Sequence, residues 1–259
     1  MSGPNSTDAS TVGLIPPRGV ITVFADIWCS FAHIAVHRLH TTRARLGLTE
    51  QVSFDLRAFP LELLNDAPSP RPGTDSEVAR MAVLEPDAGW QLWQAKDWLY
   101  PSTTLPALEA VLATKEQSLN ASEQLDLGLR RAFWAESRCV SHRRVILDVA
   151  AATGVVDVDA LTEALDDGRA RRALADQAAL AGSDRIDCSP HLFLPDGSDH
   201  ANPGIDVGWA GDYGIGWPVI VSDDPRVYED ILLRAAAAWR HGGMAAWRHG
   251  GMAAWRHGR

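Results

Sequence analysis

The chain has 259 residues, of which 46% are hydrophobic and 22% are charged, and its formal net charge is -9. This balance excludes a disordered chain and allows one large domain or two modest ones. No apolar run approaches the roughly 18 residues of a membrane-spanning helix, and the acidic charge disfavours a broad nucleic-acid-binding surface. The first residues lack the basic and apolar segments of a secretory signal. We therefore expect a cytoplasmic protein with neither a membrane nor a nucleic-acid partner.

The two ends of the chain differ from its middle in composition. Residues 1–18 are rich in Ser, Thr, Gly and Pro, which predicts a flexible leader. Residues 238–259 belong to a nearly threefold repeat of the unit AAWRHGGM. The Gly-Gly pairs disfavour a continuous helix, so we predict a largely disordered tail. Its Trp-Arg-His triplets leave open a role in binding an acidic partner or a metal.

An ordered pattern begins at Gly19 with a strand, a helix and a second strand. The apolar, β-branched run VITVFA predicts a buried strand over 20–25. A helix is expected over about 29–46, because apolar residues recur there at helical spacing. The run VSFDLRAF then predicts a strand over 52–59. Together these elements form a βαβ unit.

The middle of the chain, from about residue 75 to 182, has helical periodicity almost throughout. Thr104 is expected to cap one helix at its start, and Gly154 and Gly182 to end two others. The predicted helical segments are 76–85, 89–100, 105–117, 125–137, 143–154 and 159–182. This pattern predicts a helical subdomain inserted between two parts that contain strands.

Strand patterns return after this insertion. The runs 191–195 and 219–221 are apolar and β-branched, and a last helix is expected over about 225–237. The glycines between residues 208 and 216 have no strand-turn-helix unit around them, so we interpret them as a loop rather than as a dinucleotide-binding fingerprint.

Cys29 lies where the first strand passes into the first helix. Free backbone N–H groups and the helix dipole at such a position stabilise a thiolate and can lower the pKa of a cysteine from about 8.5 toward 3.5–7.5. The alternative is a small buried core residue, since free cysteines are often buried. With only three cysteines, the chain has too few for a disulfide framework. The position of Cys29 favours a site of thiol chemistry.

The residues around Cys29 resemble a known family. The run FADIWCSFAHIAVHRL is similar to the active-site turn of DsbA-like thioredoxin-fold proteins. It most resembles the FrnE-type oxidoreductases and the related 2-hydroxychromene-2-carboxylate isomerases and kappa-class glutathione transferases. The runs LRRAFWAESRCVSHRRVILDVAAATG, SPHLFLPDGSDHANPG and DDPRVYEDILLRA resemble later parts of the same proteins.

This resemblance covers about residues 19–237 and implies an α/β fold. Residues 19–60 and 186–237 would form the thioredoxin-like domain, with residues 61–185 as an all-helical insertion between its βαβ and ββα halves. The implied activity is thiol-disulfide oxidoreduction, on a small thiol or on a protein thiol or disulfide.

One departure from the family bears on mechanism. Its redox members carry Cys-x-x-Cys, whereas this chain has Cys29, Ser30, Phe31 and Ala32. Without a second cysteine, the motif cannot resolve a mixed disulfide by itself. Cys29 could act as a monothiol resolved by glutathione, mycothiol or another small thiol. It could instead orient such a thiol in an isomerase or transferase, or belong to a site that only binds. We expect no tightly bound cofactor and no metal.

The resemblance also implies the second half of the site. Ser189 and Pro190 would form the cis-proline loop that shapes the substrate groove, and Trp28, Ser30 and Phe31 would complete it. Cys188 precedes this proline by two residues and could act as a displaced resolving thiol. Alternation along an extended segment favours its pointing away from Cys29.

Three histidines, His33, His37 and His40, share one face of the first helix. A zinc site is disfavoured because neighbours on one helix rarely close a tetrahedral site alone. A solvated polar face is expected instead. His33, one turn after Cys29, is the candidate to hold the thiolate or relay a proton.

Two further residue types are assigned to the core. Cys139 is interpreted as structural, and the tryptophans of segment 89–100 as core residues. Trp90 and Trp93 are candidates to line a cleft between the insertion and the thioredoxin-like half.

Overall fold

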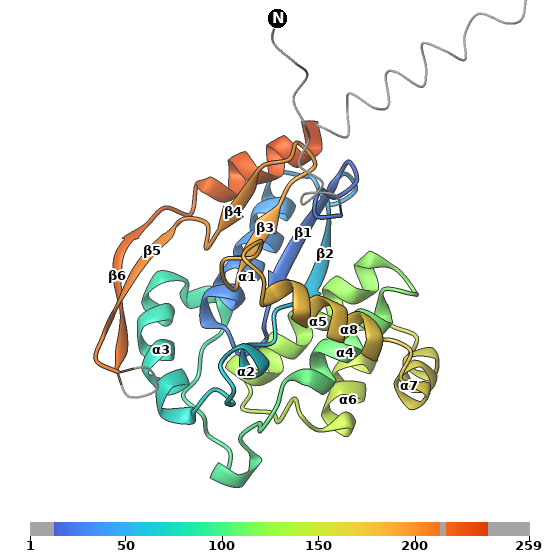
Figure 1. Ribbon diagram of the computed structural model, residues 1–259, viewed down its shortest axis with the longest axis vertical. Coiled ribbons are helices and arrows are strands. Elements are labelled where there is room, and N and C mark those ends of the chain that lie inside the picture. Colours follow the sequence, from blue (N-terminus) through green and yellow to red (C-terminus); the bar gives the residue numbers. More distant parts are fainter. Residues whose placement is uncertain (1–12, 213–215, 238–259) are drawn as a thin grey trace, which may run out of the picture.

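The computed structural model describes residues 13–212 and 216–237 (Figure 1). The predicted repeat tail and residues 1–12 of the predicted leader lie outside these ranges. Within the segment predicted as a leader, Leu14 is only 3% exposed and packs in a small core cluster with Phe24 and Phe59, whereas Ile15 is 49% exposed.

A four-stranded sheet with the order β2-β1-β3-β4 forms the centre of the thioredoxin-like half. Strand β1 (Val20–Ala25) runs parallel to β2 (Ser53–Ala58) and antiparallel to β3 (His191–Phe193). Strand β4 (Asp199–Ala201), absent from the sequence prediction, pairs with β3. β1 has a partner on each edge, which explains why its sequence is almost entirely apolar.

Helix α1 (Ser30–Arg45) follows β1, with Cys29 as its N-cap and Leu46 as its C-cap. Gly47 has a φ of 65°, a left-handed conformation that favours glycine after a helix. Residues 32–36 are all buried, so α1 is enclosed on more than one face. The strand and helix predicted around Cys29 are therefore confirmed.

The insertion predicted between the two halves is also confirmed. It contains α2 (Leu61–Leu64), α3 (Arg71–Leu84), α4 (Leu105–Thr114), α5 (Leu119–Trp134), α6 (Arg143–Thr153), α7 (Val158–Asp167) and α8 (Arg171–Ala181), with two short 3-10 helices at Pro86–Ala88 and Asp97–Leu99. Helices α4, α5 and α8 contact β2. Helix α3 lies apart from them, beside the C-terminal hairpin (Figure 1).

Two helix predictions within the insertion are wrong. Segment 89–100 forms a single 3-10 turn rather than an α-helix, because Gly89 has a φ of 78° and the Trp93 backbone is held by α3 side chains. Segment 159–182 is two helices, α7 and α8, separated at Gly168, whose φ is 66°.

Thr104 occupies the N-cap position of α4, but its side chain does not cap the helix. Its hydroxyl donates to Asp26 Oδ1 instead, at 3.0 Å. Glu62 Oε1 accepts the N–H groups of Thr104 (2.8 Å) and Leu105 (3.2 Å). The Glu62 carboxylate of α2 thus accepts the backbone N–H groups that have no partner within α4 at its start.

Strands β5 (Ile205–Ala210) and β6 (Trp217–Asp223) form a separate two-stranded sheet that contacts α3. The strand predicted at 219–221 therefore exists but lies outside the central sheet, and Gly208 is in a strand rather than a loop. The last helix spans residues 227–237, with Ile231 and Leu232 fully buried. Over the ranges given above, no helix is long and apolar enough to cross a membrane.

Candidate active site

The structure brings Cys29 and the Ser189-Pro190 loop together. The peptide bond between Ser189 and Pro190 is cis, as the resemblance implied. The Cys29 thiol donates a hydrogen bond to the Ser189 carbonyl oxygen at 2.9 Å, and its Sγ accepts one from the Ala32 N–H at 3.4 Å. Cys29 is 8% exposed. The residue expected to be the nucleophile therefore lies against the cis-proline loop with little access to solvent.

The sequence predicted that the helix N-terminus lowers the pKa of Cys29, and this prediction is wrong. Burial raises the pKa of the Cys29 thiol to about 12, and the carboxyl groups of Glu77 and Asp26 act in the same direction. The hydrogen bonds to Ser189 and from Ala32 oppose the rise and are outweighed. Loss of water around the sulfur disfavours the charged form more than the helix end favours it.

Asp26 fastens the turn between β1 and α1. Its Oδ1 accepts hydrogen bonds from the Trp28 N–H (2.9 Å) and the Thr104 hydroxyl, and its Oδ2 accepts one from the Leu61 N–H (2.7 Å). Its own N–H donates to Ser189 Oγ at 3.0 Å. Burial raises the pKa of Asp26 to about 6, despite these bonds. The Ser189 side chain is thus engaged within the fold, and its carbonyl faces the thiol.

Helix α5 supports the same turn from below. Arg130, which is fully buried, makes two hydrogen bonds to Asp126 (2.7 and 3.1 Å) and donates to the Asp26 carbonyl oxygen at 2.8 Å. Trp134 Nε1 donates to the Ile27 carbonyl oxygen at 2.9 Å. The backbone just before Cys29 is therefore held by buried side chains of the insertion.

A pocket of about 190 Å³ opens beside Cys29. Two predicted groove residues, Trp28 and Phe31, line it, whereas Ser30, Ser189 and Pro190 are not among the lining residues. Ser30 is fully buried. The remaining lining residues come from α2, α3, the segment between them and β5: Leu61, Asn65, Ser69, Pro70, Gly73, Thr74, Glu77 and Trp209. None of these eight residues could be predicted from the sequence, since no local pattern links them to Cys29.

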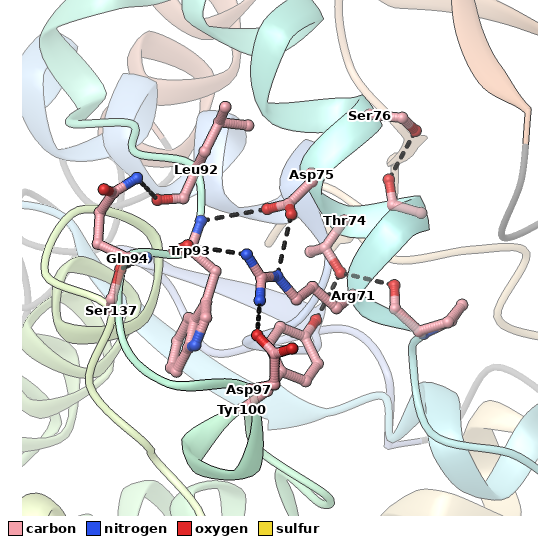
Figure 2. A network of polar contacts seen from close by, with 12 residues as sticks. Arg71, Thr74, Asp75, Ser76, Leu92, Trp93, Gln94, Asp97, Tyr100 and Ser137 are labelled. Atoms are coloured by element: carbon pink, nitrogen blue, oxygen red, sulfur yellow. Dashed lines mark hydrogen bonds and ion pairs between the residues drawn. The ribbon is translucent and has the colours of Figure 1, made fainter.

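The wall contributed by α3 is fastened at its first turn by Arg71. The Arg71 guanidinium binds Asp75 (3.2 Å), Asp97 and the Trp93 carbonyl oxygen (3.0 Å), and Asp75 accepts the Trp93 N–H at 3.2 Å (Figure 2). These bonds join α3 to segment 89–100. They also explain why that segment is extended over Trp93 rather than helical.

Two hydroxyl groups complete this attachment of α3. Thr74 Oγ1 and the Tyr100 hydroxyl lie 2.5 Å apart (Figure 2). Ser76 Oγ donates to the Gly216 carbonyl oxygen at 3.0 Å. Helix α3 is therefore bonded to segment 89–100 and to Gly216, which directly precedes β6.

The prediction of a solvated histidine face is wrong. His33 is 2% exposed, its ring stacks on Trp134 and meets Trp90 edge-on, and its Nε2 lies 3.0 Å from the Ala88 carbonyl oxygen. His37 and His40 are half-buried. Burial lowers the pKa of His33 to about 3. The ring makes no hydrogen bond to Cys29, so its predicted role in holding the thiolate has no support from its contacts.

The other two cysteines have environments of their own. Cys188 Sγ donates to the Pro190 carbonyl oxygen at 3.3 Å, and burial raises the pKa of Cys188 to about 11. Cys188 does not line the pocket. Cys139 is buried, and all three cysteines are free. Trp93 packs in the core and Trp90 against it, and neither lines the pocket. Trp98 is 75% exposed, so the core prediction is wrong for this tryptophan. Within the described chain, no group of three His, Cys, Asp or Glu side chains could hold a metal ion.

A strand that leads into a helix-capping cysteine, with a cis-proline loop against its sulfur, places the chain among thioredoxin-like proteins. The family model described as a DSBA-like thioredoxin domain matches residues 20–207. The chain belongs to this family of thiol-disulfide oxidoreductases and isomerases.

Solved structures confirm the fold over nearly the whole chain. A putative protein disulfide isomerase from Nitrosomonas europaea superposes with a TM-score of 0.57 at 13% identity, covering 87% of this chain and 98% of the other. A probable DsbA oxidoreductase from Streptomyces coelicolor also gives 0.57, at 14% identity, covering 85% and 90%. The cytosolic disulfide reductase DsbM from Pseudomonas aeruginosa, solved with GSH, gives 0.52 at 15% identity, covering 88% and 99%.

A 2-hydroxychromene-2-carboxylate isomerase structure has a TM-score of 0.50 at 15% identity and covers 88% of this chain and 98% of its own. No curated protein matches the sequence. At these identities the structures show the fold, which is the DsbA-like thioredoxin fold with a helical insertion that the sequence predicted.

Proposed function

We propose that the protein is a monothiol oxidoreductase that exchanges disulfides with a small thiol through Cys29. The observation that carries this proposal is the place of Cys29: its sulfur borders the pocket, at the helix start and against the Ser189 carbonyl of the cis-proline loop. Ala32 stands where the second cysteine of the family's redox members would be. Neither Cys139 nor Cys188 is among the residues that line this pocket.

The reaction proceeds in two exchanges. The Cys29 thiolate attacks one sulfur of a disulfide RS–SR′, so that a Cys29–S–S–R bond forms, the original S–S bond breaks and R′S⁻ leaves to become R′SH. A small thiol R″SH, as its thiolate, then attacks the R sulfur and releases Cys29. The net reaction converts RS–SR′ and R″SH into R′SH and RS–SR″. The incoming thiol takes the role that a second motif cysteine would otherwise have.

The size of the pocket is compatible with a small thiol. Its volume of about 190 Å³ is below the roughly 300–1,000 Å³ of pockets that enclose a whole drug-sized ligand. It therefore suits the sulfur-bearing end of glutathione, mycothiol or a similar thiol. The relative DsbM was solved with GSH. The cytoplasmic location that we predict from the sequence would supply such thiols in reduced form.

A second candidate is a small-thiol-dependent isomerase or transferase. Apolar side chains of Trp28, Phe31, Leu61 and Trp209 surround the pocket, which suits an aromatic or electrophilic substrate. In this case Cys29 would hydrogen-bond to the bound thiol and would not form a covalent bond. The fold that the chain shares with a 2-hydroxychromene-2-carboxylate isomerase is compatible with such chemistry.

Intact-mass spectrometry after incubation with oxidised glutathione tests the proposal. We expect a single glutathione adduct, located on Cys29 by peptide mapping, which reduced glutathione removes. Cys29→Ser should abolish the adduct, and the matched control Cys188→Ser should retain it. An adduct only on Cys188, or none, would contradict the monothiol mechanism. If the protein converts an aromatic electrophile in the presence of glutathione, and Cys29→Ser retains this activity, the second candidate is favoured. If neither activity is detected, a non-catalytic binding module is favoured.

A further inference from the structure

We propose that Glu77 is the acid and base of this site, exchanging a proton with Cys29 and with the small thiol. This inference rests on the proposed function, since it names the residue that handles the protons of the two exchanges. Nothing in the sequence around Glu77 indicates such a role. The inference comes from where the fold places its side chain.

Glu77 and Cys29 line the same pocket from different parts of the chain. Cys29 belongs to the start of α1, and Glu77 to the middle of α3 in the insertion. Among the described residues that line the pocket, these two have ionisable side chains. The Glu77 carboxyl is close enough for its charge to raise the pKa of Cys29. A small thiol that enters the pocket to reach Cys29 therefore meets Glu77.

The chemistry of Cys29 needs such a partner. Because burial raises the pKa of Cys29 to about 12, almost all of the thiol is protonated at pH 7, whereas the thiolate is the nucleophile. Burial raises the pKa of Glu77 to about 7, and the nearby Ser30 hydroxyl opposes the rise. A carboxyl group that titrates near neutral pH can both accept and donate a proton.

Each exchange then balances its protons within the pocket. The Glu77 carboxylate takes the proton of the Cys29 thiol as the sulfur attacks RS–SR′, and the Glu77 carboxylic acid returns it to the leaving R′S⁻. In the second exchange, Glu77 takes the proton of R″SH and gives it to Cys29 as this sulfur leaves. No oxidant or reductant is required beyond the disulfide and the thiol.

Other charged groups around α3 are engaged elsewhere. On α3 itself, Arg71 and Asp75 bind segment 89–100. On α1, Arg38 binds Glu85 and the β6 residue Asp223. The remaining ionisable groups on α3 and on the elements packed against it lie outside the pocket lining: Arg80, His33, His37, His40, Arg43, Arg45 and Asp87. Asp26, beneath Cys29, is held by its own hydrogen bonds.

The rate of Cys29 alkylation by iodoacetamide between pH 5 and 9 tests the role of Glu77. In the unmodified protein, the rate should rise through pH 7 as Glu77 loses its proton. In Glu77→Gln this rise near pH 7, which we call the step, should disappear. The alkylation rate at pH 8 should fall at least tenfold, since general acid-base groups accelerate reactions by about 10²–10⁴-fold. Glu77→Asp should retain the step with a reduced rate.

Asp75→Asn is the matched control, because it also neutralises a carboxylate of α3 but lies in the contacts with Trp93 and Arg71. It should retain the step near pH 7. Faster alkylation of Glu77→Gln at every pH would overturn the proposal, since Glu77 would then act only as a charge that suppresses the thiolate. A protein without the step near pH 7, or with Cys29 unreactive at every pH, would also overturn it.

The two proposals fail in different ways. If no glutathione adduct forms but alkylation keeps its step through pH 7, the proposed exchange is wrong and Glu77 still handles the proton of Cys29. If the adduct forms and is released equally fast in Glu77→Gln, the exchange stands and the role of Glu77 is wrong.

Discussion

The floor and the wall of the pocket are held by different kinds of interaction. The floor, which is the turn from Asp26 to Cys29, rests on buried groups such as Arg130 and Asp126. The wall, which is the start of α3, is tied by Arg71 to Asp97, whose side chain is 86% exposed. Buried charged pairs are costly to break, whereas exposed pairs contribute little. The fold therefore fixes the thiol firmly and the opposing carboxyl of Glu77 more loosely.

Breaking the buried pair under the floor should have the largest effect. Asp126→Asn leaves the Arg130 guanidinium without its carboxylate in a fully buried position. We expect the free energy of unfolding to fall by about 3–5 kcal/mol, measured by urea denaturation. Asp148→Asn is the control, because its partner Arg144 is 86% exposed, and it should cost less than about 1 kcal/mol. Equal losses of unfolding free energy in the two variants would contradict the difference between the buried and the exposed ion pair.

Acid should destabilise the folded protein through His33, which lies in α1 one helical turn after Cys29. The pKa of His33 is lowered to about 3, so between pH 6.5 and 3 the unfolded chain binds the proton that the folded chain excludes. The free energy of unfolding is therefore unaffected by His33 above pH 6.5 and decreases as the pH falls below this value. At pH 5 the loss due to His33 is about 2 kcal/mol.

Replacement of His33 tests this dependence. We compare the free energy of unfolding of His33→Gln with that of the unmodified protein, by urea denaturation at pH 7.5 and at pH 5. The difference between the two proteins should shift by about 2 kcal/mol in favour of His33→Gln when the pH is lowered from 7.5 to 5. The exposed His142→Gln serves as the control and should show a smaller change. A His33→Gln effect that does not depend on pH would disprove the assignment. Glu77, with its raised pKa, should act in the opposite sense, because its folded form holds the proton until about pH 7.

Loosening the wall should change access more than stability. Arg71→Gln removes the bonds to Asp75, Asp97 and the Trp93 carbonyl. We expect a loss of less than about 1 kcal/mol and a several-fold faster alkylation of Cys29 at pH 8. Arg172→Gln, which breaks an exposed pair with Asp176 on α8, should change neither quantity. Unchanged alkylation of Arg71→Gln would show that α3 does not restrict access to the sulfur.

Local patterns were sufficient for the βαβ part of the thioredoxin-like half, but not for β4 or for the place of the strand at 219–221. Strand β1 and helix α1 follow from apolar runs and spacing, and the position of Cys29 follows from their junction. The extended course around Trp93 could not be predicted, because its tryptophans have helical spacing while its backbone is held by Arg71 and Asp75. Contacts distant in sequence decide such a segment.

The same reason explains what was missed at the site. Glu77 and Trp209 reach Cys29 only through the packing of α3 and β5, which no spacing along the chain encodes. The direction in which the fold shifts the pKa of Cys29 could not be predicted from the sequence either. The helix end is visible as a motif, but the burial that outweighs it depends on the closed tertiary structure.

The hydrogen bond from the Asp26 N–H to Ser189 Oγ joins residues 163 positions apart. A ribosome that adds about 5–20 residues per second needs on the order of 10–30 s to cover that interval. Throughout this time β1 can pair with β2, which follows closely, but not with β3. The emerging chain therefore presents Cys29 without its cis-proline loop and β1 with one open edge. Early encounters with cellular thiols or with other chains fall within this interval.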